Sequence, residues 1–243
     1  KENKFCAIGE VNLSMAKIGG QLICTGGEFR NKNGFALVAE RIYVQEDILL
    51  NDNFHAIGGV NLVSAKIGRN LDCTNGIFEN ETAINIENSH INGEFIAEWE
   101  KLSGKLVLDK AKVLKISINI DPEKWPQKKK LSMNGFEYEK FSDEMDWEIL
   151  LEWIRGQDTF YSQPYIHLAK VLKNYGHYEE AIKVLIEKEE EKTKIGLESL
   201  IKIYKGFKKI RRNLKDILKI LKIENKKIFN FSYVFREIFW FIK

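Results

Sequence analysis

The sequence predicts a β-solenoid followed by an α-helical domain, an α+β chain in which the two kinds of structure occupy separate segments. Two near-copies, residues 7–31 and 56–80, share 16 of 25 aligned residues at a shift of 49, which indicates a repeat architecture. Within each copy, pairs of apolar residues separated by one spacer recur about every five residues. In the second half of the chain, apolar residues recur instead at steps of three and four, which is typical of amphipathic helices.

The paired apolar residues indicate short extended segments that alternate with corners. Two residues separated by one spacer point to the same side of a strand, so the pair Val11 and Leu13 and the pair Val60 and Leu62 would face a common core. Glycine and asparagine lie between such pairs, as at Gly26, and suit corners because they tolerate positive φ. One circuit takes about 22 to 25 residues. We therefore expect about five coils, stacked about 4.8 Å apart.

The segments VNLSMAKIGG and VNLVSAKIGRN, which begin at Val11 and Val60, resemble the repeat unit of a known protein family. Over roughly residues 5–120 the chain resembles the pentapeptide-repeat proteins, with extra corner residues and with Ile or Phe where that family uses Leu. The resemblance implies an irregular, quadrilateral, right-handed β-helix. Some members of that family imitate DNA through an acidic surface. Residues 1–120 here carry 13 basic and 15 acidic residues, which is too nearly balanced for such mimicry.

Two classes of solenoid enzyme are disfavoured. Hexapeptide acyltransferases need an aliphatic residue every six positions, whereas the Ile-Gly pairs here recur at ten and 49. Polysaccharide lyases and hydrolases need acidic residues clustered with Arg or Lys on one outer face, and no repeated acid pair occurs at the outward positions. The four histidines are scattered and the three cysteines lack CxxC spacing, so the sequence predicts no metal or cofactor site. We expect a protein that is not an enzyme.

A linker is predicted between the two halves. The composition changes at the segment PEKWPQKKK, and we interpret the chain as a repeat domain over residues 1–120, a linker over 121–142 and a helical domain over 143–243. In the helical domain, Asp143 suits the N-cap of a first helix and Gly156 suits its end.

The next segment, SQPYIHLAKVLKNYGHYEEAIKVLI, predicts an antiparallel helix pair. Ser162 caps the first helix, Pro164 lies in its first turn and Gly176 ends it. The segment resembles a single tetratricopeptide repeat. Because one repeat cannot form the superhelical groove of that family, the family's peptide-binding function is not carried over.

From Leu197 onward, the sequence predicts a cationic amphipathic helix of about 25 residues. Its apolar residues form a heptad seam. The seam consists of Leu200, Ile203, Phe207, Ile210, Leu214, Ile217 and Leu221. Residues 200–243 carry 13 basic and 3 acidic residues although the whole chain has a net charge of only +3. This basic segment on a weakly acidic body indicates an anionic partner.

The candidate binding residues lie in this basic segment. Those expected to bind the anionic partner are Lys208, Lys209, Arg211, Arg212 and Lys215. Those expected to contact a membrane are Phe235, Phe239, Trp240 and Phe241. Basic and aromatic residues flank the cytoplasmic ends of spanning helices, although no apolar run reaches the ~18 residues that a span needs. The order of segments resembles a group of bacterial membrane-associated proteins of unassigned function.

These observations predict a non-enzymatic scaffold or adaptor on the cytoplasmic side of a membrane, with an anionic membrane surface and an unidentified protein as partners. It would be peripheral or the cytoplasmic part of a truncated membrane protein. The alternative is a cytoplasmic sensor, or the regulatory half of a membrane effector or enzyme whose active part lies beyond residue 243. A helix packed on its own domain, or a coiled coil that makes a homo-oligomer, also accounts for the seam. Nucleic acid is the least favoured partner because no base-reading motif accompanies the lysines.

Overall fold

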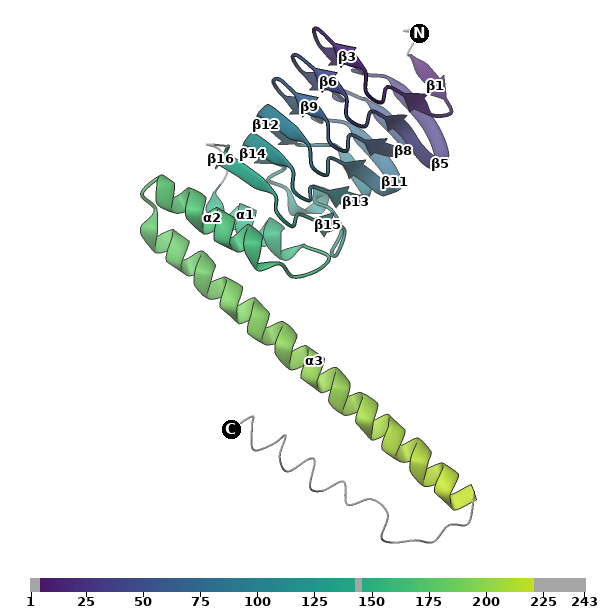
Figure 1. Cartoon of the computed structure of the whole chain (residues 1–243), viewed down its shortest axis with the longest axis vertical. Coiled ribbons are helices and arrows are strands. Elements are labelled where there is room, and N and C mark those ends of the chain that lie inside the picture. Colours follow the sequence, from purple (N-terminus) through teal and green to yellow (C-terminus); the bar gives the residue numbers. More distant parts are fainter. Residues whose placement is uncertain (1–4, 143–145, 221–243) are drawn as a thin grey trace. The chain divides into compact units, whose positions relative to one another are not determined.

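The structure of the chain, a computed structural model, describes residues 5–142 and 146–220, and the exposure of side chains is described as far as Ile210 and at Asn213. Residues 6–141 form a parallel β-solenoid, and helices follow it (Figure 1). The fold class expected from the sequence is therefore confirmed. The chain divides into two units, Lys1–Glu189 and Glu190–Lys243, and the solenoid belongs to the first.

Two parallel sheets form the walls of the solenoid. The seven-stranded sheet contains β1 (Cys6–Ile8), β2 (Val11–Asn12), β5 (Glu28–Val38), β8 (His55–Asn61), β11 (Ile77–Asn85), β13 (Lys101–Val107) and β15 (Leu131–Ser132). The nine-stranded sheet contains β3 (Lys17–Ile18), β4 (Leu22–Ile23), β6 (Tyr43–Val44), β7 (Ile48–Leu49), β9 (Lys66–Ile67), β10 (Leu71–Asp72), β12 (His90–Ala97), β14 (Lys112–Ile118) and β16 (Glu137–Phe141).

The register between coils explains the internal repeat. Cys6 pairs with Glu28, Glu28 with His55, His55 with Ile77 and Ile77 with Lys101, at steps of 22, 27, 22 and 24 residues. The first two steps make up the 49-residue shift, so the shift corresponds to two coils and each near-copy covers about one coil. The path of the seven-stranded sheet passes through six strands in turn, which gives about six turns, one more than expected.

The additional turn comes from residues 121–142, for which the sequence predicts a linker. A short 3-10 helix, η1 (Pro122–Lys124), is followed by β15, which pairs with β13, and by β16, which pairs with β14. Apolar side chains of this segment are buried in the core. They are Leu131, Met133, Phe136 and Tyr138. The basic, proline-containing stretch is thus an excursion between two strands, after which the pattern of apolar pairs resumes and the sheets continue.

One corner of the coils is built in the same way in each turn. Its left-handed residues are Met15, Arg41, Ser64, Asn88, Lys110 and Gly135. Each lies in a turn closed by a backbone hydrogen bond, as from the Ala16 N–H to the Leu13 carbonyl at 3.1 Å. The sequence predicts glycine or asparagine at corners, yet four of these six residues are of other types. Bonds to the next coil, such as Met15 N–H to Glu40 O at 2.8 Å, hold the corner and offset the ~1–2 kcal/mol cost of a positive φ.

The core is a continuous column of apolar side chains. Inside the first coils, the rings of Phe29, Phe54 and Phe78 stack with centroid separations of 5.3 and 5.6 Å, and the exposed ring of Phe5 lies 5.5 Å from that of Phe29 at the end of the row. Cys24 and Cys73 are buried free thiols. Burial raises the pKa of Cys24 to about 11 and that of Cys73 well above its usual value. These cysteines therefore act as small apolar residues, as their equivalent places in the two copies predict.

In the described residues after the solenoid, the chain forms the helices α1 (Trp147–Arg155), α2 (Ser162–Asn174) and α3 (Tyr178–Ile220). Asp143 lies outside the described residues, and the N-cap position of α1 is Asp146. The N-cap of α2 is Tyr161, one residue before the cap that the sequence predicts. Gly176 separates α2 from α3 with φ of +85°, in agreement with its predicted role. The sequence predicts separate hairpin and amphipathic helices, but α3 runs through both segments.

The apolar core continues from the solenoid into the first helices. The side chains of Leu150 and Trp153 of α1 and of Leu168 of α2 are buried in the same cluster as the last coil. Arg155 forms ion pairs with Glu152 and with Glu187 of α3. The start of α3 is thus attached to the body of the first unit.

Candidate functional site

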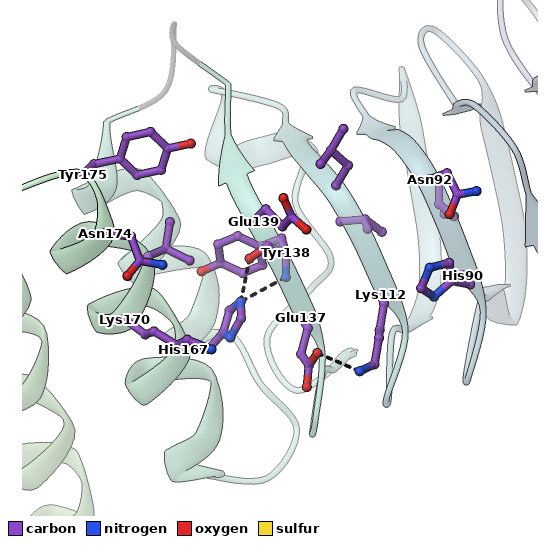
Figure 2. A pocket seen from close by; sticks show the side chains of 14 residues that line it. His90, Asn92, Lys112, Glu137, Tyr138, Glu139, His167, Lys170, Asn174 and Tyr175 are labelled. Carbon is purple, nitrogen blue, oxygen red and sulfur yellow. Dashed lines mark hydrogen bonds and ion pairs between the residues drawn. The ribbon is translucent and has the colours of Figure 1, made fainter.

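The described part of the chain contains a polar groove between the last coils and α2. Its volume is about 760 Å³, and it is lined by residues of β12, β14, β16 and α2 (Figure 2). His90 and Lys112 reach it from the solenoid, and His167, Lys170 and Asn174 reach it from α2. These residues come from three separate segments of the sequence, and the fold brings them together.

A carboxylate lies among bases in this groove. Glu137 Oε2 is 2.9 Å from Lys112 Nζ. The hydrogen bond from Lys112 holds the pKa of Glu137 below its usual value, and the charges of Lys112, His167 and Lys170 act in the same direction. Because both side chains of the Lys112–Glu137 pair are about half exposed, the pair stabilises the fold only slightly.

His167 caps the open edge of the solenoid. Its Nε2 lies 2.9 Å from the backbone nitrogen and 2.7 Å from the carbonyl oxygen of Tyr138, so it accepts from the N–H or donates to the C=O according to its tautomer. One helical turn earlier, Gln163 accepts a hydrogen bond from Gly135 N–H at 3.0 Å and donates one to Phe136 O at 3.2 Å. Since β16 has no further strand beyond it in the described sheet, these side chains satisfy backbone groups that would otherwise be unpaired.

We expect acidification to destabilise the protein through His167. Burial lowers the pKa of His167, although the Tyr138 backbone and the charge of Glu137 oppose this shift. The unfolded histidine takes up a proton near its ordinary pKa of about 6.5, whereas the folded ring resists protonation. This contribution to stability is therefore complete above pH of about 6.5 and declines as the pH falls towards the folded pKa. Thermal unfolding at about pH 7.5 and about pH 5.5 measures it.

The matched variant for this measurement is His167→Gln. An amide can bond to the same backbone groups but does not titrate, so the variant should lose less stability on acidification than the parent chain. An equal loss in both proteins would contradict the assignment to His167.

The basic helix segment predicted as a binding site lies on α3. Lys208 and Lys209 are exposed on this helix. Arg211, Arg212 and Lys215 lie further along it, and their side chains are outside the description. The predicted membrane contacts, Phe235, Phe239, Trp240 and Phe241, lie outside the described residues.

The apolar seam of α3 is uncovered as far as the description reaches. Leu200, Ile203, Phe207 and Ile210 are 47%, 55%, 46% and 56% exposed. Their spacing of three and four residues puts them on one side of the helix. No helix in the described part of the chain is both long enough and apolar enough to cross a membrane.

Sequence reasoning missed the groove and its residues. Lys112, Glu137 and His167 have no common spacing along the chain, so no local pattern marks them. The spacing of Gln163 and His167, four residues apart on a predicted helix, is the one local signal of the edge cap. Among residues 5–142 and 146–220, no three His, Cys, Asp or Glu side chains gather closely enough to hold a metal ion.

Comparison with known proteins gave no match: no family model, no curated protein and no solved structure is significantly similar to this chain.

Proposed function

We propose that the protein is a non-enzymatic scaffold or adaptor that binds the anionic cytoplasmic face of a membrane through α3. The observation that supports this proposal is the exposed apolar seam on a helix whose other side bears lysines. A continuous row of exposed apolar side chains is typical of an interaction site. An amphipathic helix with lysines opposite its apolar face lies in the membrane interface, with the apolar side chains inserted and the lysines near acidic head groups.

The solenoid supplies the scaffold in this proposal. We infer an irregular, right-handed, pentapeptide-repeat-like helix, with α2 and the beginning of α3 as a single tetratricopeptide-like hairpin. The four short strands of the first coil, β1 to β4, support a quadrilateral cross-section. Successive coils bonded in register make a rigid rod whose outer faces can present side chains to a partner protein. We also infer that the protein is bacterial and that the solenoid binds a partner protein.

Liposome flotation tests the tether. The variant Lys208→Ala/Lys209→Ala should bind vesicles containing acidic lipid roughly 30-fold more weakly, because each lysine near such a surface contributes about 1 kcal/mol. The matched control is Lys128→Ala/Lys129→Ala, another adjacent and exposed lysine pair. Equal binding to neutral and acidic vesicles, or equal losses in the two variants, would contradict the proposal. So would a stable dimer in the absence of lipid that Phe207→Ser dissociates, since the seam would then be covered by a second copy.

A further inference from the structure

One outer face of the solenoid carries a regular ladder of cationic and aromatic side chains. Its five rungs, here called the cationic ladder, are Lys17, Tyr43, Lys66, His90 and Lys112. They are the first residues of β3, β6, β9, β12 and β14, which stack along one side of the rod (Figure 1). Each rung is the direct partner of the next in the strand register. All five side chains are exposed, and the residue after each points inward.

The lysines of the cationic ladder recur on alternate coils. With coils about 4.8 Å apart, successive lysines are about 10 Å apart, and one ring lies between each pair. Within the described residues, no acidic side chain forms an ion pair with Lys17 or Lys66, whereas Lys112 is paired with Glu137 at 2.9 Å. The ladder therefore offers a row of cations at a fixed interval, and two of them have no ion-pair partner among the residues that the structure describes.

The interval discriminates between partners. A polyproline II segment has three residues per turn and a rise of about 3.1 Å, so every third side chain recurs at about 9.3 Å on one side. An extended strand repeats its same-side residues at about 6.7 Å. A nucleic-acid strand in a duplex carries a phosphate about every 3.4 Å. The polyproline II repeat comes closest to the two-coil interval among these three.

The chemistry of this face agrees with that geometry. The backbone groups of the stacked strands are used in bonding coil to coil, so a partner laid across the face cannot add itself as a further strand. A polyproline II segment needs no such bonds because its backbone is solvated and its conformation is largely preformed. Proline-rich segments also pack on exposed aromatic rings, which Tyr43 provides at 46% exposure.

We propose that the cationic ladder binds an acidic, proline-rich segment of a partner protein in the polyproline II conformation, with a carboxylate at every third residue. This inference names the class of protein partner in the adaptor proposal and rests on that proposal. The carboxylates bind Lys17, Lys66 and Lys112, and the prolines between them pack on Tyr43 and His90.

Fluorescence anisotropy of the full chain with a labelled peptide of repeated Glu-Pro-Pro triplets tests the proposal. A peptide of the same composition with its glutamates clustered at one end should bind more weakly. Equal binding of the two peptides would show that the affinity depends on charge alone and not on the spacing of the glutamates, and it would overturn the proposal. Tighter binding of a single-stranded DNA oligonucleotide, or of a helical peptide of glutamate and alanine, would overturn it in favour of another partner.

Variants locate the binding on the ladder. The variant Lys17→Ala/Lys66→Ala should weaken the affinity for the triplet peptide about tenfold, and Tyr43→Ala should weaken it about threefold. The control Lys32→Ala/Lys128→Ala removes two exposed lysines outside the nine-stranded sheet and should change nothing. Glu137→Gln should strengthen binding about twofold, since it frees Lys112 from its ion pair. A gain of affinity cannot come from misfolding, so an unchanged or weaker affinity in this variant would contradict the assignment of Lys112.

The two proposals fail separately. The peptide is measured without membranes, and Lys208→Ala/Lys209→Ala should bind it as the parent chain does. A loss of flotation with intact peptide binding would contradict the membrane proposal alone. Intact flotation without peptide binding would contradict the proposal for the cationic ladder alone.

Discussion

Replacing Phe54 by alanine is expected to lower the free energy of unfolding by about 4 kcal/mol, as for other buried phenylalanines. Phe54 has no exposed surface, and its ring stacks between those of Phe29 and Phe78 at 5.3 and 5.6 Å. The substitution leaves a cavity that adjoining coils cannot fill, since their backbones are bonded to each other on both sides. Urea unfolding followed by circular dichroism measures the loss.

Two variants control this measurement. Phe54→Leu keeps most of the buried volume and should cost about 1 kcal/mol. Tyr175→Ala removes an aromatic ring that is 57% exposed, and should change the stability little. A loss at Phe54 no greater than that at Tyr175 would refute the stacked-ring account of the core.

Gly104→Ala is expected to destabilise the solenoid by about 3 kcal/mol or more, through backbone strain and steric overlap together. Gly104 has φ of +141°, a conformation that side chains disfavour. A Cβ at this position would lie 1.7 Å from the carbonyl oxygen of Asn80 in the previous coil, so the two coils would have to separate locally. The thermal unfolding midpoint should fall steeply.

Gly20→Ala is the matched control. A Cβ at Gly20 meets nothing within 4 Å, so the same chemical change should leave the stability within about 0.5 kcal/mol. Similar stabilities for the two alanine variants would show that the coils at Asn80 and Gly104 are not packed as described.

The solenoid was predictable because its information is local and repeated. A pair such as Val60 and Leu62 fixes the inward side of a short strand, and the 49-residue shift fixes the register between distant coils. The number of coils was harder to predict from the sequence. The excursion at residues 121–142 interrupts the pattern with prolines and lysines, and only the pairing of β15 and β16 shows that the same sheets continue after it.

The candidate sites differ in how far the sequence revealed them. Lys17 and Lys66 occupy equivalent places in the two copies, so their outward position could be predicted, but the alignment with His90 and Lys112 depends on coils that are not copies. The groove depends on α2 folding back over β16, which joins Glu137 to the neighbourhood of His167. Such contacts between segments of unrelated pattern leave no periodic trace in a single sequence.

The equivalence of the 49-residue shift with two coils bears on how such a chain can lengthen. A duplication of 49 residues adds a pair of coils, so lysine rungs and aromatic rungs keep their order and the rod gains a whole additional binding interval. A duplication of a single coil would put two rungs of one kind next to each other and break the rhythm. Duplication of the 49-residue unit can therefore lengthen this surface without changing the order of the side chains on it.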